Sequence, residues 1–130
     1  LKQLNSFVLA RRKIASIYLK ELKNDERFIL PKEKINYYHS YHIFPLQVNF
    51  DKIKIDKKEL FKRFKKKGIN LQVHYIPIHL QPFYKKKFGY KINQFPNAEK
   101  FYRNEISLPI YPELKLSDLY KVINELLSIK

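Results

Sequence analysis

The four histidines of the chain form two pairs, His39 with His42 and His74 with His79. Imidazole binds zinc, so a fold that joined the pairs would offer four ligands. However, the spacing does not match the helical His-Glu-x-x-His site, cysteine is absent, and neither pair encloses an acidic residue. We predict no metal site and expect at least two of the histidines to be half-buried at strand ends. Strand-end imidazole and phenol groups could instead donate to the oxygens of an anionic ligand.

The chain does not contain a complete set of residues for covalent catalysis. Ser40 and His42 begin a pattern similar to Ser-x-His-x-x-Lys, in which the lysine forms a Schiff base with a cofactor, but Pro45 holds the lysine position. Gly68 and Gly89 are the only glycines, which excludes a Gly-rich phosphate loop. The carboxylates are scattered and give no acid and base pair. The residues therefore offer ligand contacts without a catalytic centre.

A strong positive charge leaves a second function class open. Lys and Arg number 27 against 12 Asp and Glu, a formal charge of +15, which attracts nucleic acid and other anions. Residues 61–67 and 85–87 mix basic and aromatic side chains, a combination that binds single-stranded nucleic acid. The spacing of Phe61 and Phe64 equally fits the apolar face of a solvated amphipathic helix. A small basic protein that binds nucleic acid or another anionic partner is thus the alternative to an enzyme domain.

The length of 130 residues fits one domain with a real core. No apolar run approaches the roughly 20 residues of a membrane span, and no signal peptide is recognisable, so we expect a cytoplasmic protein. The chain contains no Met and starts inside a predicted helix. We therefore expect it to be part of a longer protein.

Hydrophobic periodicity predicts alternating helices and strands, with no repeat and no long linker. A long amphipathic helix is expected over residues 4–22 and a strand over 41–50, where Pro45 indicates an edge or a bulge. Asp56 and Glu59 form a capping box for a helix that ends at Gly68, and a second strand follows over 69–76.

The remaining third of the chain is expected to be mainly helical. A short helix over 80–88 ends at Gly89, and Asn97 caps a helix over 98–105. Prolines keep residues 107–114 extended, and Ser117 caps a last amphipathic helix. The predicted fold is one compact α/β or α+β domain with an extended N-terminal helix.

Seven segments, read in order, form a recognisable series. They are Arg-Arg-Lys-Ile-Ala at 11–15, His-Ser-Tyr-His-Ile-Phe at 39–44, Gly-Ile at 68–69, Gln-Val-His-Tyr-Ile-Pro-Ile-His at 72–79, Gln-Pro-Phe-Tyr at 81–84, Phe-Pro-Asn-Ala-Glu at 95–99 and Ile-Ser-Leu-Pro-Ile-Tyr-Pro at 106–112. Together they resemble the C-terminal part of the DegT/StrS family of pyridoxal phosphate (PLP) sugar-nucleotide aminotransferases, most of all its pseudaminic acid branch. The resemblance spans nearly the whole chain.

The resemblance implies the small domain of a fold-type I aminotransferase, with a mainly antiparallel sheet flanked by helices. Residues 1–24 would be the connecting helix from the large domain, and residues 25–130 the small domain. The Schiff-base lysine, the aspartate that pairs with the pyridine nitrogen and most phosphate contacts would lie upstream. The chain would then contain no catalytic residue, would hardly retain PLP, and would be inactive alone.

The resemblance also implies which residues face the active site. These are His74, Tyr75, Gln72 and His42, with His74 near the sugar nucleotide or cofactor, where it could donate to a phosphate or sugar oxygen. The intact enzyme would be a homodimer that transfers an amino group from glutamate to a UDP-linked 4-keto-6-deoxy hexose for surface glycan synthesis, with neither membrane nor nucleic acid as a partner. His39 and His79 are expected to be structural. A functionless gene remnant, which would expose the apolar face of its first helix, is a third possibility.

Overall fold

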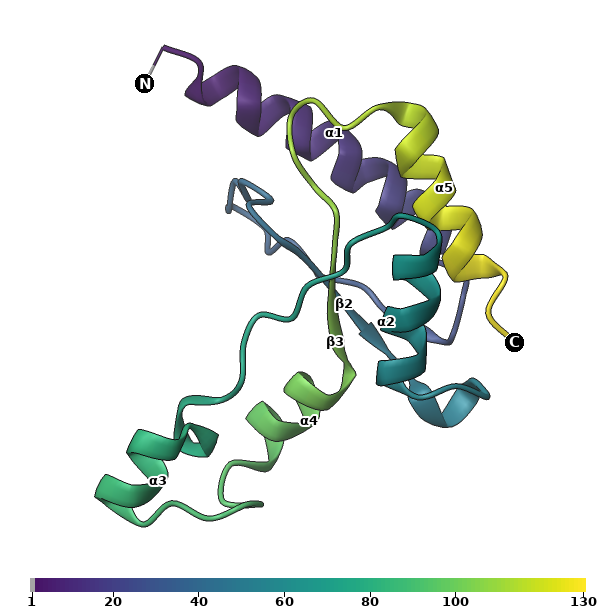
Figure 1. The fold of residues 1–130 in the computed structure, drawn as a ribbon. Coiled ribbons are helices and arrows are strands. Elements are labelled where there is room, and N and C mark those ends of the chain that lie inside the picture. Colours follow the sequence, from purple (N-terminus) through teal and green to yellow (C-terminus); the bar gives the residue numbers. More distant parts are fainter. Residues whose placement is uncertain (1) are drawn as a thin grey trace.

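The computed structural model describes residues 2–130 and shows five α-helices packed with a small sheet (Figure 1). In chain order the elements are α1 (Leu4–Leu22), β1 (Phe28–Ile29), β2 (Phe44–Val48), the 3-10 turn η1 (Phe50–Lys52), α2 (Lys57–Lys66), the 3-10 turn η2 (Ile78–Leu80), α3 (Pro82–Phe88), α4 (Pro96–Asn104), β3 (Glu105–Leu108) and α5 (Leu116–Leu127). The predicted small antiparallel sheet flanked by helices is confirmed.

The sheet has the order β1-β2-β3, and both pairings are antiparallel. Phe44 pairs with Leu108 and Leu46 with Ile106, so these apolar side chains share one face. Pro45 and Ser107 form the pair between them, and their side chains lie on the opposite face. The alternation of the strands thus separates an apolar face from a polar one.

Helices α1, α2 and α5 cover the apolar face and bury one continuous core. Figure 1 shows α1 and α5 side by side, and each contributes a stripe of buried side chains at helical spacing. Fully buried members of the core include Ala15, Tyr18, Leu22, Phe44, Leu46, Val48, Leu60, Phe64, Ile106, Leu119, Ile123, Leu126 and Ile129. The C-terminal half of the predicted linking helix therefore belongs to the same core as the sheet.

The predicted strand over residues 69–76 is wrong. Only Gln72 in this segment joins the sheet, through an isolated antiparallel bridge to Ser107 of β3. Since β3 is itself antiparallel to β2, Gln72 runs parallel to β2 with β3 between them. The strand that completes the sheet is β3, most of which was assigned to a helix or to an extended tail because it lies far from its partners in sequence.

Pro45 lies in the central strand, yet its imide nitrogen faces an open position. The backbone N–H and C=O of Ser107 both bond to Gln72, at 2.8 and 3.2 Å, and so point away from Pro45. The nitrogen of Pro45 must then face the side of β1, which pairs only with Gln47 and Val48. The edge predicted from Pro45 exists locally, although β2 as a whole is not an edge strand.

Helix ends follow the sequence signals at α2 and depart from them later. The Asp56 carboxylate accepts the N–H of Glu59 at 2.7 Å, and Gly68 adopts a positive φ of 72°. The N–H groups of Gly68 and Ile69 return to α2 carbonyls in a Schellman turn. In contrast, the caps predicted at Asn97 and Ser117 are wrong. Each lies within the first turn of its helix and makes no capping bond.

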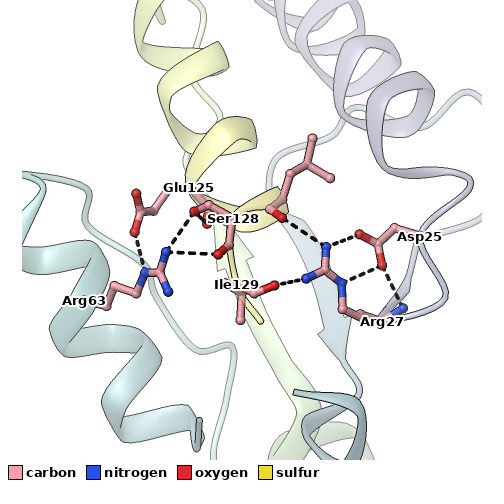
Figure 2. A network of polar contacts seen from close by, with 7 residues as sticks. Asp25, Arg27, Arg63, Glu125, Ser128 and Ile129 are labelled. Carbon is pink, nitrogen blue, oxygen red and sulfur yellow. Dashed lines mark hydrogen bonds and ion pairs between the residues drawn. The ribbon is translucent and has the colours of Figure 1, made fainter. Parts of the chain in front are cut away.

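Two arginines hold the C-terminus against the body of the domain (Figure 2). The Arg27 guanidinium binds the Asp25 carboxylate and the backbone carbonyls of Leu127 and Ile129. Arg63 of α2 binds Glu125 of α5 at 2.5 Å and the hydroxyl of Ser128 at 2.8 Å. Arg63 thus joins the C-terminus to α2, and Arg27 joins it to the loop that follows α1. We assign these bonds a role in stabilising the fold and not in the functional site.

Candidate functional site

A pocket of about 480 Å³ lies at one end of β3. Its walls come from residues 68–74, which follow α2, from residues 107–114, and from the beginning of α5. The Schellman turn at Gly68 directs the chain toward the Gln72 bridge and thereby forms one wall. The polar side chains that line the pocket are His42, Asn70, Gln72, His74, Ser107, Tyr111, Asp118 and Lys121.

Three of the four site residues predicted from the resemblance line this pocket, namely His42, Gln72 and His74. Tyr75 is not among the lining residues, and its side chain is 75% exposed. The ring of Tyr75 instead packs edge-on against the His74 ring, with centroids 4.7 Å apart. The structure therefore groups an amide and two imidazoles, while Tyr75 lies beside them.

His74 is held by two residues that sequence reasoning missed, Glu105 and Ser107 of β3. The Glu105 carboxylate accepts the backbone N–H of His74 at 3.1 Å and the hydroxyl of Ser107 at 2.5 Å. The Oγ of Ser107 lies 2.7 Å from Nδ1 of His74. Glu105 is completely buried. The only sequence signal for these partners was an acidic residue and a serine alternating with Ile106 and Leu108, which places both on the polar face of a strand.

The segment before His42 is anchored to α1 by an ion pair. Arg12 binds Glu33 at 2.7 Å and donates to the carbonyl of His39, and Glu33 accepts the N–H of His39. The bond to Arg12 lowers the pKa of Glu33 and raises that of Arg12. Nδ1 of His39 accepts the N–H of Tyr41 at 2.9 Å. His39 thus has a structural role, as expected, and the anchor fixes the chain directly before the pocket.

His79 lies outside the pocket, in an arm made of residues 78–104 that extends from the body of the domain (Figure 1). It is buried and bonded to Glu99 at 2.9 Å, which again fits the structural role predicted for it. Within residues 2–130, no three acidic, histidine or cysteine side chains lie close enough to hold a metal ion. No helix in the same range could cross a membrane.

The chain is similar to known proteins of one family. The model of the DegT/DnrJ/EryC1/StrS aminotransferase family matches residues 1–127. The chain belongs to this family. It is 45% identical over 119 residues to the protein MJ1066 of Methanocaldococcus jannaschii, and 36% identical over 129 residues to the UDP-4-amino-4,6-dideoxy-N-acetyl-β-L-altrosamine transaminase of Campylobacter jejuni. The alignments cover 92% and 99% of this chain.

The fold agrees with that of a solved family member. Helicobacter pylori PseC, an aminotransferase involved in the biosynthesis of pseudoaminic acid, superposes with a TM-score of 0.86 at 28% identity and covers 98% of this chain. The match takes up 33% of the PseC chain. The chain also spans about a third of the length of the curated relatives, 31% and 34%. It therefore corresponds to one part of these aminotransferases.

Aminotransferases of this family depend on PLP, and a sugar aminotransferase of Streptococcus pneumoniae with a TM-score of 0.84 was solved in its PLP form. A PLP site needs a lysine for the Schiff base and a dense set of phosphate donors. Among residues 2–130, Lys121 is the one lysine that lines the pocket, and it lies exposed on α5. No Gly-rich loop accompanies it. The residues that line this pocket therefore do not make a PLP site by themselves.

Proposed function

We propose that this chain is the small domain of a PLP-dependent aminotransferase that transfers an amino group from glutamate to a UDP-linked 4-keto-6-deoxy hexose for surface glycan synthesis. Residues 25–130 form the domain, and residues 1–24 connect it to a large domain of the kind that the relatives carry upstream. The large domain would supply the Schiff-base lysine and the PLP contacts. The intact enzyme would be a cytoplasmic homodimer.

The observation that carries this proposal is the pocket in which His42, Gln72 and His74 meet. An amide and two imidazoles offer donors and acceptors suited to sugar hydroxyls and a diphosphate. Tyr75, exposed beside His74, would contact the substrate once the large domain closes the site. In this role the chain positions substrate and supplies no catalytic residue.

The exposed start of α1 supports the proposed connection. Leu4 and Leu9 are 51% and 59% exposed, whereas Tyr18 and Leu22 farther along the same helix are fully buried. An apolar stripe that begins in solvent and ends in a core fits a helix that spans two domains. The gene-remnant hypothesis accounts equally for this exposed stripe, so activity has to decide between them.

A chimera tests the function. The C. jejuni transaminase matches this chain over 129 residues, so its C-terminal third can be replaced by residues 1–130. We expect the chimera to transfer the amino group, and His74→Ala to lower kcat/KM by about tenfold, as the loss of one hydrogen bond worth about 1.4 kcal/mol predicts. Tyr120→Ala, an exposed change on α5 outside the pocket, is the control.

A chimera that folds and shows the visible absorbance of bound PLP but transfers no amino group would contradict the proposal. So would an H74A variant as active as Y120A. The alternative of nucleic-acid binding is tested with the 130-residue chain alone. A steep decrease in affinity for unrelated DNA with added salt, set by several phosphate contacts, would favour that alternative.

A further inference from the structure

The hydrogen bonds between Glu105, Ser107 and His74 restrict where their protons can be. An ionised carboxylate only accepts hydrogen bonds, so the Ser107 hydroxyl, 2.5 Å from Oε1 of Glu105, must donate its single proton there. Ser107 Oγ then has only lone pairs to offer Nδ1 of His74 at 2.7 Å. The imidazole must therefore carry a proton on Nδ1.

Further contacts of Glu105 are those of a carboxylate that accepts hydrogen bonds. Its second oxygen, Oε2, accepts the backbone N–H of His74, so both oxygens act as acceptors. Lys57 of α2 is near enough for its charge to interact with Glu105, and its Nζ donates to the carbonyl of Tyr102 at 2.7 Å. Both oxygens of Glu105 thus face donors and a positive charge lies nearby, as in the charge-assisted hydrogen bonds of a carboxylate.

The other ring nitrogen of His74 remains available to the pocket. Nε2 has no hydrogen-bond partner within residues 2–130, and in that range no buried side-chain nitrogen or oxygen lacks a partner. Because His74 is only partly buried, Nε2 must be accessible to solvent or ligand. In the neutral ring with its proton on Nδ1, Nε2 has a free lone pair.

We propose that Glu105 and Ser107 are positioning residues that hold neutral His74 in its Nδ1–H form, so that Nε2 acts as a hydrogen-bond acceptor in the pocket. The inference rests on the proposed function for its ligand, a sugar hydroxyl or amide N–H. It revises the expectation that His74 donates to a phosphate oxygen. A lone pair aimed at the sugar selects for donor groups and repels the oxygens of a diphosphate.

Nitrogen-15 NMR of the histidine rings in the 130-residue chain tests the proton position directly. At about pH 8, where an ordinary histidine is neutral, we expect the Nδ1 of His74 to be protonated and the Nε2 to be bare. The His74 signals are assigned by their loss in His74→Ala. A wild-type ring with its proton on Nε2 would overturn the proposal.

Ser107→Ala removes the hydroxyl that accepts the Nδ1–H of His74 and leaves a small side chain at this position of β3. We expect the His74 tautomer to change in this variant and to stay as in the wild type in Ser16→Ala, the same substitution at an exposed position of α1. Amide spectra show whether each variant is folded. A folded S107A chain that retains the Nδ1–H form would also overturn the proposal.

Addition of UDP-N-acetylglucosamine separates this inference from the proposed function. If His74 has the expected tautomer but its ring signals in the chimera, where the large domain completes the site, do not respond to the nucleotide sugar, the positioning role stands and the proposed substrate is wrong. If the ring has the opposite tautomer and responds, the pocket binds the nucleotide sugar without the arrangement proposed here. If UDP alone changes Nε2 as much as the nucleotide sugar does, His74 faces the diphosphate, which contradicts its role as an acceptor for the sugar.

Discussion

Nε2 of His79 lies 2.9 Å from Oε1 of Glu99, and both side chains are buried inside the arm of residues 78–104. The carboxylate also accepts the backbone N–H groups of Asn93 and Phe95, at 3.0 and 3.5 Å. One side chain therefore connects η2, the loop before α4 and the first turn of α4. Glu99 thus binds the N–H of Phe95, the N-cap residue of α4, whose own side chain makes no capping bond.

This arrangement predicts an arm that is sensitive to acid. The bond to His79, followed by the N–H of Asn93, lowers the pKa of Glu99 from its ordinary value of 4.5. A carboxyl group with a lowered folded-state pKa stabilises the fold fully above its unfolded pKa, and the stabilisation is lost as pH falls through the folded value. We expect Glu99→Gln to flatten the fall in thermal stability below about pH 4.5. Glu113→Gln, an exposed control, should leave it unchanged, and identical profiles for both variants would contradict the prediction.

The bonds between Arg27 and the C-terminus predict that the fold loses stability when Arg27 is replaced. Arg27→Ala removes the partner of Asp25 and the donor to the carbonyls of Leu127 and Ile129. Hydrogen bonds to charged groups of this kind contribute about 1–2 kcal/mol when partly exposed, and urea unfolding measures the difference. Arg103→Ala, an exposed change on α4, should alter stability by less than about 0.5 kcal/mol. Equal losses of unfolding free energy in the two variants would contradict a stabilising role for the Arg27 bonds.

Neighbouring leucines of α5 predict opposite outcomes for the same substitution. Leu126 is fully buried in the core and Leu127 is 42% exposed. Leu126→Ala should reduce the free energy of unfolding by about 2–5 kcal/mol, because it removes packed methyl groups and leaves a cavity. Leu127→Ala should cost less than about 0.5 kcal/mol. Comparable losses at the two positions would mean that α5 does not pack on the sheet as described.

We expect the 130-residue chain not to retain PLP by itself. Mixed with PLP and passed through gel filtration, the 130-residue chain should emerge without a stoichiometric visible absorbance, because the one lysine that lines the pocket beside His74, Lys121, is exposed. The active chimera, treated identically, should retain the absorbance. One equivalent of PLP held by the chain alone would show that its residues make a cofactor site.

Local features of the chain could be predicted because their causes lie within a few residues. The apolar spacing of residues 4–22 matches α1 (Leu4–Leu22) without error, and Asp56 and Gly68 mark the two ends of α2. The series of motifs sufficed to indicate the aminotransferase family, which the family comparison confirms. His42, Gln72 and His74 were chosen as site residues from that resemblance, and they line one pocket.

The partners of those residues could be found only in the tertiary structure. Most backbone groups of a helix bond within the helix, whereas a strand needs a neighbour that can be far away in sequence. Thus β3 was missed and residues 69–76 were overestimated as a strand, although a single bridge joins Gln72 to Ser107. Glu105 and Ser107 lie 31 and 33 residues from His74. The family resemblance indicated His74, and the folding of β3 against it brought the Ser107 hydroxyl within 2.7 Å of its Nδ1.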